Sequence, residues 1–318
     1  MTECFVGFDT SNYTTSAAVC DIDGNVVANI KMPLSVKSGE RGLRQSDAVF
    51  SHVKNLPTVS DMLSEVLQKG YKPLAVGVSS RPRDEEGSYM PCFLCGVAQA
   101  HAFASALSIP IYEFSHQNGH VMAAAYSSGK TEELIADRFL AFHVSGGTTE
   151  ALLIKPIGSS FGVELVGETL DLNAGQLIDR IGVALGLDFP CGPSLEKLAC
   201  EFDGEIPRAA VSVKNCCCNL SGFENKALKL YEETKDKRLV SAFVFDGVCR
   251  TLIKMAEQLM DKHGELPILF AGGVMSNRYM RSALAERFEA HFSEPAFSAD
   301  NAAGISLLCR REFLYNKK

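Results

Sequence analysis

Two histidines four residues apart, His116 and His120, are the first candidates for chemistry in this sequence. On a helix, this spacing places both imidazoles on one face, about 40° apart and one turn along the axis, where both can bind one metal ion. A zinc peptidase needs a glutamate base directly after the first histidine, and this chain has Gln117 there. The spacing therefore leaves a metal site or a pair of capping or surface histidines. Asp300, at the start of the last predicted helix, is a candidate third ligand or a helix N-cap.

Two Gly-Gly turns are the candidates for phosphate binding. The first lies in the segment Val144-Ser145-Gly146-Gly147-Thr148-Thr149, where a backbone without side chains can approach an anion closely. The second, Gly272-Gly273, lies between a predicted strand and a predicted helix from Asn277, whose N-terminus offers free N–H groups. Each turn alone could be a simple hairpin or a tight strand–helix connection. Together they favour a bound nucleotide or acyl-adenylate.

Acidic residues between glycines form a second candidate set for such a ligand. They occupy the segments 171–179 and 186–196, which include Asp179, Gly192 and Glu196. These carboxylates could accept hydrogen bonds from ribose hydroxyls, or they could be solvated helix ends. Their sequence pattern alone favours the solvated helix ends.

The predicted elements around these candidates repeat along the chain. Short apolar runs and turns predict a three-stranded meander over 4–30. At a constant offset of 134 residues, Phe139 to Leu153 lies over Phe5 to Val19 without a gap. Two such hairpins, each opening one half, indicate duplicated α/β domains around a cleft, with chance similarity as the alternative. We expect an N-terminal domain over 1–135 with the histidine pair and a C-terminal domain over 136–318 with the nucleotide cradle and a helical insertion. Packing of the last helix back on the first domain is an alternative.

Composition places the chain among ordinary globular proteins. Its 318 residues are 46% hydrophobic and 22% charged, which excludes collagen, coiled coil and disorder and suggests about two domains. No apolar run reaches ~18 residues and no basic and apolar leader opens the chain, so we expect a cytoplasmic protein without a membrane span. Eleven cysteines fit free thiols in a reducing compartment, most of them small buried hydrophobes.

The net charge of −7 argues against a protein that coats nucleic acid unaided. Contact with RNA would therefore need a local basic patch or the surface of a partner. The candidates for such a patch are Lys31, Lys37, Arg41, Arg44, Arg81 and Arg83.

The order of these motifs resembles the TsaD family of tRNA threonylcarbamoyladenosine transferases, once described as O-sialoglycoprotein endopeptidases. The resemblance covers nearly the whole chain and rests on seven blocks. They are HxxxH at His116 to His120, VSGGxT at Val144 to Thr149, GETLD at Gly167 to Asp171, AGxxxD at Ala174 to Asp179, LGLDFPxGP at Leu185 to Pro193, AGGVxxN at Ala271 to Asn277 and ADN at Ala299 to Asn301.

The resemblance implies an actin/hexokinase-like α/β fold of two duplicated domains around a central cleft. It implies one divalent metal ion, Fe²⁺ or Zn²⁺, held by His116, His120 and Asp300. His143 would be an extra ligand, because it stands where some relatives carry a tyrosine near the metal. Threonylcarbamoyl-adenylate, or ATP, ADP or AMP, would occupy the cleft. The implied nucleotide-binding residues are Val144, Ser145, Gly146, Gly147, Asp179, Gly192, Glu196 and Asn277, to which the second glycine turn adds Gly272 and Gly273.

The implied reaction is an acyl transfer to tRNA. The exocyclic amine of the adenosine beside the anticodon attacks the carbamoyl carbon, and AMP leaves. The metal would act as Lewis acid and template, and N–H groups of the glycine loop would stabilise the developing charge. The implied partners are tRNA and TsaB-like and TsaE-like proteins, with a homodimer as a further candidate and no membrane.

The chain departs from the family pattern in segments that would face the second substrate. The loop 9–15 has lost the acids after its serine, and Tyr13 stands where a catalytic aspartate is expected, so Asp9 and Tyr13 are the candidate catalytic residues. The segment Arg81–Gly87 replaces a G-P-G sequence, Phe223-Glu224-Asn225 lacks a family lysine, and Thr148 replaces a frequent histidine. A catalytically weakened paralogue, acting as a nucleotide- and metal-binding regulatory or assembly subunit, is therefore the alternative. A kinase of the same fold and a peptidase rank lower.

Overall fold

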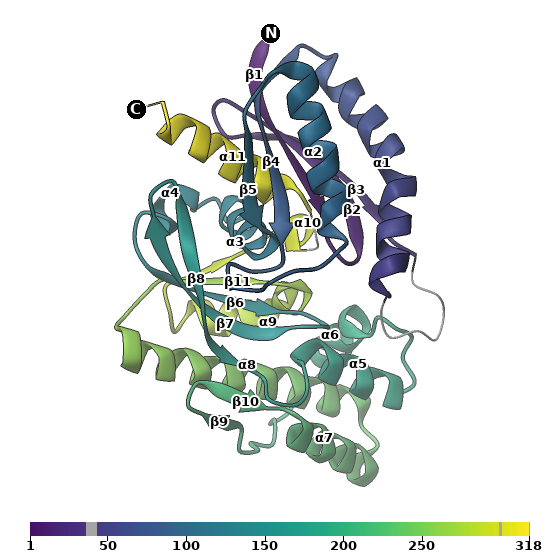
Figure 1. Cartoon of the computed structure of the whole chain (residues 1–318). Coiled ribbons are helices and arrows are strands. Elements are labelled where there is room, and N and C mark those ends of the chain that lie inside the picture. Colours follow the sequence, from purple (N-terminus) through teal and green to yellow (C-terminus); the bar gives the residue numbers. More distant parts are fainter. Residues whose placement is uncertain (36–42, 299–300, 318) are drawn as a thin grey trace. The chain divides into compact units, whose positions relative to one another are not determined.

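Two five-stranded sheets organise the chain, and each contains one of the two predicted hairpins (Figure 1). The computed structural model describes residues 1–35, 43–298 and 301–317. The chain divides into two units. The first comprises Met1–Ala136, Lys155–Val163 and Ala296–Lys318, and the second comprises Asp137–Ile154 and Glu164–Pro295.

The sheet of the first unit has the strand order β3-β2-β1-β4-β5. Its strands are β1 (Thr2–Thr10), β2 (Thr14–Asp21), β3 (Val26–Pro33), β4 (Tyr71–Arg81) and β5 (Ile111–Ser115). Its helices are α1 (Gln45–Leu67), α2 (Phe93–Leu107), α3 (His116–Ser127), α4 (Thr131–Leu134) and α11 (Ala303–Tyr315), the last preceded by the short α10 (Pro295–Ser298). The pairs β1/β4 and β4/β5 are parallel, so the carboxyl ends of three strands meet at one edge.

Helices cover both faces of this sheet, which is why β1 is buried from Cys4 to Thr10. Alternate residues of a strand point to opposite faces. Val6 and Phe8 pack in one apolar cluster with α1 and α2. Phe5 instead contacts Phe313 of α11, with ring centroids 5.4 Å apart. Gly7 lies so close to α11 that a Cβ there would be 2.5 Å from the Ser306 nitrogen, so this strand position excludes any side chain.

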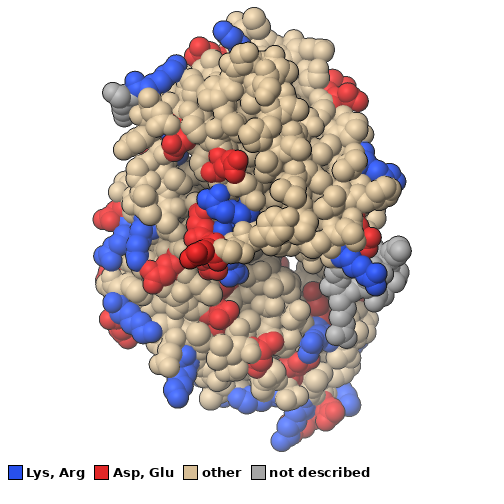
Figure 2. All heavy atoms as spheres, viewed as in Figure 1, with Lys and Arg blue, Asp and Glu red and all other residues tan. Residues whose placement is uncertain are grey.

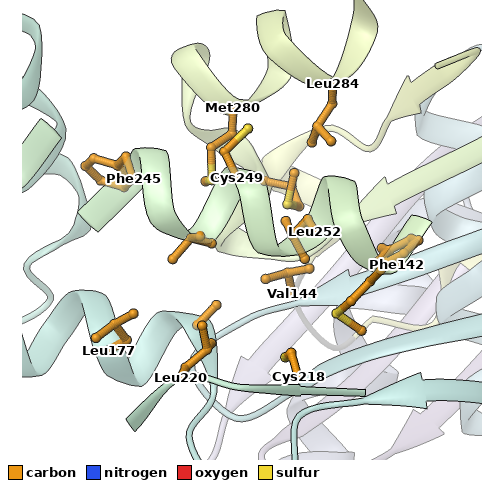
Figure 3. Close-up of a cluster of buried hydrophobic side chains, with 14 of the residues drawn as sticks. Phe142, Val144, Leu177, Cys218, Leu220, Phe245, Cys249, Leu252, Met280 and Leu284 are labelled. Carbon is orange, nitrogen blue, oxygen red and sulfur yellow. The ribbon is translucent and has the colours of Figure 1, made fainter. Parts of the chain in front are cut away.

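The sheet of the second unit has the order β12-β11-β6-β7-β8. Its strands are β6 (Phe139–Val144), β7 (Thr149–Ile157), β8 (Ser160–Glu168), β11 (Ile268–Ala271) and β12 (Ala290–Phe292), and a separate hairpin is formed by β9 (Ser212–Lys214) and β10 (Cys217–Asn219). Its helices are α5 (Ala174–Ala184), α6 (Gly192–Cys200), α7 (Ser221–Thr234), α8 (Lys237–His263), the 3₁₀ helix η1 (Gly273–Ser276) and α9 (Arg278–Ala285). The long helix α8 lies at the centre of the apolar core, where Cys249 and Leu252 approach Val144 and Phe142 of β6 (Figure 3).

The predicted internal repeat is confirmed by strand order and by register. Read from β8, the second sheet has the order of the first, with β6 in the place of β1. In the first hairpin Phe8 pairs with Ala17, and in the second Phe142 pairs with Ala151, at the same offset of 134 residues. The repeated sequence therefore encodes one hairpin geometry twice.

Three elements differ from the predicted ones. The helical spacing of apolar residues over 53–69 predicts a helix from Val53. Helix α1 begins earlier, at Gln45, because buried Ala48 and His52 extend its inner face through a polar stretch. Helix α9 begins at Arg278, so Asn277 is its N-cap rather than its first residue. The stretch 169–239, which was expected to be rich in helix, also contains the β9–β10 hairpin.

The eleven cysteines all lie in the described part of the chain, and all are free thiols. Nine of them are buried, which confirms the prediction that most are small core residues. Burial raises the pKa of Cys20 and of Cys249 to about 12, so these thiols stay protonated and unreactive. Among the described residues, no helix is long and apolar enough to cross a membrane.

Candidate functional site

Both histidines lie on one helix, the case in which their spacing places them on the same face. Helix α3 follows β5 directly, and Ser115, the last strand residue, caps it by accepting a hydrogen bond of 3.2 Å from the Asn118 N–H. His116 and His120 occupy successive turns, with their Nε2 atoms 2.9 Å apart. Two imidazole nitrogens thus converge on one point, as binding of both to one metal ion requires.

Asp9, near the end of β1, stands behind His116. Its Oδ1 lies 3.1 Å from His116 Nδ1 and also accepts a hydrogen bond from Ser79 Oγ on β4. The Asp9 side chain is 1% exposed, and its Oδ2 is buried with no hydrogen-bond partner among the described residues. A carboxylate on the second nitrogen of a ligand imidazole fixes the ring and raises its basicity. Asp9 therefore acts on the histidine pair, because its carboxylate holds the His116 ring.

The donor atoms of the histidine pair and its carboxylate fit a metal ion. Asp300 lies outside the described residues. His143 lies on β6 in the second unit, with its Nδ1 4.0 Å from Glu150 Oε1. Across residues 1–35, 43–298 and 301–317, no three His, Cys, Asp or Glu side chains lie close enough together to hold a metal. The fit rests on the convergent Nε2 atoms, the anchored His116 ring and the unpartnered Asp9 oxygen.

The first hairpin loop is held by a buried histidine of α1. His52 is 0% exposed, and its Nε2 lies 2.8 Å from the Ser11 carbonyl, which can only accept. Its Nδ1 therefore accepts from the Thr15 hydroxyl, 2.8 Å away. Burial lowers the pKa of His52, against the opposing effects of the Ser11 carbonyl and the Asp9 carboxylate. Sequence analysis missed His52, and no local pattern distinguishes it from other helix residues.

Tyr13, the other candidate catalytic residue, lies at the tip of this loop. Its side chain is 47% exposed, and its carbonyl accepts a hydrogen bond of 2.7 Å from the Leu34 N–H. A solvent-facing phenol thus occupies the position where the family pattern has a carboxylate.

The second hairpin loop is closed by its own serine. Ser145 Oγ accepts hydrogen bonds from the N–H groups of Gly147, at 3.3 Å, and Thr148, at 3.1 Å. These two N–H groups were expected to cradle phosphate, and within the loop they already have a partner. A Cβ on Gly146 or on Gly147 would meet no atom within 4 Å. The glycines therefore border open space, and a ligand can approach their backbone closely.

A cavity of about 270 Å³ in the second unit gathers the predicted nucleotide-binding residues. Those that line it are Gly146, Asp179, Gly192, Glu196, Gly273 and Asn277. Val144, Ser145, Gly147 and Gly272 do not line it. Gly272 has another role: its φ is +99°, and a Cβ would lie 2.2 Å from the Val144 carbonyl oxygen, so only glycine lets η1 approach the end of β6.

Three polar side chains of this cavity each have one atom in a hydrogen bond within the chain and another that remains for a ligand. Asn277 Oδ1 caps α9 by accepting from the Met280 N–H at 3.0 Å, while its Nδ2 is buried with no partner among the described residues. Asp179 Oδ1 accepts from the Cys191 N–H, and Glu196 Oε1 accepts from the Arg278 N–H, both at 2.8 Å. Each carboxylate thus keeps its other oxygen for a ligand.

Apolar residues complete the cavity wall. They are Ile178, Pro190, Pro193, Phe245 and Val274. Pro190, Pro193 and Val274 belong to the LGLDFPxGP and AGGVxxN blocks, whereas Ile178 and Phe245 were not singled out from the sequence. Phe245 lies on α8, where its spacing marks it only as a core residue of an amphipathic helix. An apolar wall with a few convergent polar groups is typical of small-molecule sites.

Solved structures with the same fold confirm the predicted architecture. HypF from T. kodakarensis covers 99% of this chain with 48% of its own length, at a TM-score of 0.61 and 12% identity. Component A of the Acidaminococcus fermentans (R)-2-hydroxyglutaryl-CoA dehydratase covers 98% of this chain and 99% of its own, with a TM-score of 0.55 and 15% identity. A ROK hexokinase from Thermus thermophilus covers 99% of both chains, with a TM-score of 0.50 and 16% identity. At these identities the likeness shows the actin/hexokinase-like fold alone.

Proteins related in sequence give a more specific assignment than the shared fold does. The tRNA N6-adenosine threonylcarbamoyltransferase of Geotalea uraniireducens is 30% identical over 92% of this chain and 86% of its own length. The protein of the same name from Neorickettsia sennetsu is 29% identical over 95% of this chain and 91% of its own. The family profile described as TsaD, tRNA N6-adenosine threonylcarbamoyltransferase, matches residues 36–307, a range that includes the histidine pair and both glycine turns. The chain that carries these motifs on this fold therefore belongs to the TsaD family.

Proposed function

We propose that this chain is an acyltransferase that moves a threonylcarbamoyl group from threonylcarbamoyl-adenylate to the N6 amine of the adenosine next to the tRNA anticodon. AMP is the other product. The observation that carries the proposal is the family match over residues 36–307, with relatives of that name at about 30% identity over most of the chain. No comparison favours the regulatory or assembly subunit that the loop departures left as the alternative.

The adenosine part of the adenylate is assigned to the cavity of the second unit. The unpartnered Nδ2 of Asn277 would donate to the ligand, and the second oxygens of Asp179 and Glu196 would accept from ribose hydroxyls. The apolar side chains of Phe245 and Val274 would pack against the base. Gly192 and Gly273 have open space beside them, so a ligand could lie directly on their backbone.

The glycine loop of the second hairpin is assigned to the phosphate. Val144 and Ser145 place the loop at the end of β6, and the space beside Gly146 and Gly147 lets an anion approach the backbone. Gly272 supports the loop from η1 through its close contact with Val144. These residues contribute to the rate by holding one substrate in position for attack by the other.

One divalent ion, Fe²⁺ or Zn²⁺, is the proposed cofactor. His116 and His120 would bind it, with Asp300 and His143 as further proposed ligands. The convergence of the two Nε2 atoms supports the first two residues. When bound, the ion supplies Lewis acidity toward a phosphate or carboxyl oxygen of the adenylate.

Binding of tRNA is proposed to need partners. Lysines and arginines on the face drawn in Figure 2 are interspersed with acidic residues rather than gathered in one basic area. Of the predicted basic patch, Lys31 Nζ donates to the Ala296 carbonyl at 2.9 Å and Arg81 pairs with Asp84, while Lys37 and Arg41 lie outside the described residues. Because Lys31 and Arg81 are bonded within the chain, fewer positive side chains remain to bind RNA. TsaB-like and TsaE-like proteins are therefore the proposed partners, and the cytoplasm is the proposed site of the reaction.

Exposed apolar side chains on α1 and α2 support a protein partner. These helices lie next to each other, joined by a hydrogen bond of 3.1 Å from Gln99 to Ser60. Their solvent-facing apolar residues are Phe50, Val53, Met62, Leu94 and Leu107, between 41% and 65% exposed. A TsaB-like protein is the proposed occupant of this surface, and a second copy of this chain is the competing one. Light scattering of the chain alone and with a TsaB-like protein separates the two.

The decisive experiment reconstitutes the reaction. The purified chain is incubated with TsaB-like and TsaE-like proteins, tRNA, threonine, bicarbonate and ATP, and the modified nucleoside is measured by mass spectrometry. We expect modification that depends on this chain. No modification, in a mixture where a curated relative is active, would overturn the proposal.

Tyr13→Asp tests the main departure from the family pattern. If the loop only slows the enzyme, the variant modifies tRNA faster than the natural chain. If both remain inactive beside an active relative, the transferase function is overturned and the regulatory or assembly subunit becomes the leading candidate.

A further inference from the structure

The segment Arg81–Gly87, which departs from the family pattern, contacts the start of the histidine helix. Asp84 Oδ1 accepts two hydrogen bonds from the Arg81 guanidinium, 3.0 Å from Nε and 2.6 Å from Nη2. The other Asp84 oxygen, Oδ2, accepts a hydrogen bond of 3.0 Å from Ser115 Oγ. Asp84 therefore connects the end of β4 to the residue that caps α3.

A second bond joins the same segment to the helix. The Gln117 N–H donates to the Pro82 carbonyl at 3.0 Å. The first N–H groups of a helix have no partner within it, so this bond and the Ser115 cap satisfy two of them just after His116. The backbone that carries His116 is thus tied to the segment 81–87 from outside the helix.

The ring of His116 is fixed separately. Its Nδ1 faces Asp9 Oδ1 at 3.1 Å, and Asp9 is itself held by Ser79 Oγ. A carboxylate accepts but does not donate, so Nδ1 carries a proton, and in the neutral ring the Nε2 lone pair lies on the side of His120. The ring also packs against Phe93, with centroids 5.7 Å apart.

We infer that Asp9 and Asp84 are positioning residues for the histidine pair, Asp9 through the His116 ring and Asp84 through the cap of α3. The inference rests on the proposed metal site at His116 and His120. It gives the unusual segment Arg81–Gly87 a function of its own: the segment stabilises the start of the helix that presents both ligands. Preorganisation of this kind matters because ligands that must be ordered on binding lose affinity.

The test measures metal binding by the full chain without any substrate. The apo protein is titrated with Zn²⁺ in competition with a chromophoric chelator, and Co²⁺ is used to read ligand geometry from its visible absorption. The variants are Asp9→Asn and Asp84→Asn, with His116→Ala to remove a ligand. Glu86→Gln is the matched control, because Glu86 is an exposed acid of the same segment. Thermal unfolding of each variant checks the fold.

We expect Asp9→Asn to weaken Zn²⁺ binding by 10–100-fold, the usual effect of losing such a carboxylate. Asp84→Asn acts on the backbone rather than on the ring, so we expect a smaller loss, roughly fivefold, with an altered Co²⁺ spectrum. Glu86→Gln leaves both readouts unchanged. If Asp9→Asn does not fold, Ser79→Ala removes one hydrogen bond from Asp9, and a few-fold loss of affinity is expected.

The outcomes separate this inference from the proposals on which it rests. Loss of binding in His116→Ala with unchanged binding in both aspartate variants would overturn the positioning role. Unchanged binding in His116→Ala would overturn the metal site itself. An inactive chain that still shows the graded loss of affinity would count against the transferase function alone and would uphold the positioning role.

Discussion

The two hairpins of the chain share a register and a strand order, yet their loops present different chemistry. In the first unit, Asp9 lies just before the loop and contacts His116, and the loop between Ser11 and Tyr13 has no glycine. In the second unit, the loop contains Gly146 and Gly147, with open space beside both. One hairpin thus contributes a buried carboxylate, and the other contributes main-chain groups that no side chain covers. The comparison teaches that a duplicated hairpin can present side-chain chemistry in one copy and main-chain chemistry in the other.

A threonine common to both hairpins shows how this division is built. Thr15 and Thr149 stand at equivalent positions, and each joins its hairpin to the next helix. The Thr15 hydroxyl donates to His52 of α1, whereas Thr149 Oγ1 accepts from the Ala174 N–H at the start of α5, at 2.9 Å. The same residue therefore anchors its loop through a side chain in one unit and through a helix N-terminus in the other.

The largest expected effect comes from exchanging a residue between the two hairpins. Gly7 corresponds to Ala141, and a Cβ on Gly7 would lie 2.5 Å from the Ser306 nitrogen and 2.7 Å from the Ala302 oxygen. Because both are backbone atoms of the α11 region, Gly7→Ala should lower the free energy of unfolding by about 3 kcal/mol. The reverse exchange, Ala141→Gly, should cost about 1 kcal/mol or less. Urea unfolding measures both, and equal losses would contradict the close approach of α11.

The next effect concerns the ligand of the second unit. Asn277→Asp keeps the oxygen that caps α9 but removes the buried Nδ2 donor and adds a negative charge to the cavity. We expect AMP to bind roughly tenfold more weakly, the loss of about 1.4 kcal/mol that a charged-ligand hydrogen bond can supply. Calorimetric titration measures the affinity. The exposed Asn225→Asp serves as control, and equal affinities in all three proteins would remove Asn277 from the site.

A pH effect should distinguish the first hairpin from the second. His52 is buried and neutral with a lowered pKa, so between that pKa and the ordinary value of 6.5 the unfolded chain binds a proton that the folded chain does not. The free energy of unfolding should therefore fall as the pH decreases through this window. His52→Gln can still accept from Thr15 and donate to Ser11, and it should flatten the curve. Denaturant unfolding at several pH values tests this, and parallel curves would disprove the assignment.

The smallest effect on stability is expected at the second loop. Gly146→Ala places a Cβ in open space, so the free energy of unfolding should change by less than about 0.5 kcal/mol. AMP binding should nevertheless weaken, because the methyl group lies in the ligand cavity. Thermal unfolding and calorimetric titration of one protein sample give both values. A destabilised variant would mean that Gly146 is needed for packing rather than for ligand approach.

Local patterns predicted much of the fold and part of the site. The run of small residues over 93–107 and the amphipathic pattern over 237–263 predict helices with the bounds of α2 and α8. The spacing of His116 and His120 is that of one helix face. The repeat of the hairpins was visible because its register is preserved residue by residue. The start of α1 was missed because its first turns are polar and bury only Ala48 and His52.

The sequence by itself determined the family, the duplicated hairpin, the convergent histidines and both glycine turns, because each depends on residues close together in the chain. Tertiary structure alone decided which distant residues meet them. Asp9 reaches His116 across 107 positions because β1, β4 and β5 are parallel neighbours whose carboxyl ends share one edge. Phe245 lines the cavity of the second unit, and Asp84 reaches the cap of α3, through packing that no local pattern records. Spacing along a chain fixes a helix face or a turn, whereas contacts between segments depend on the order in which strands and helices pack.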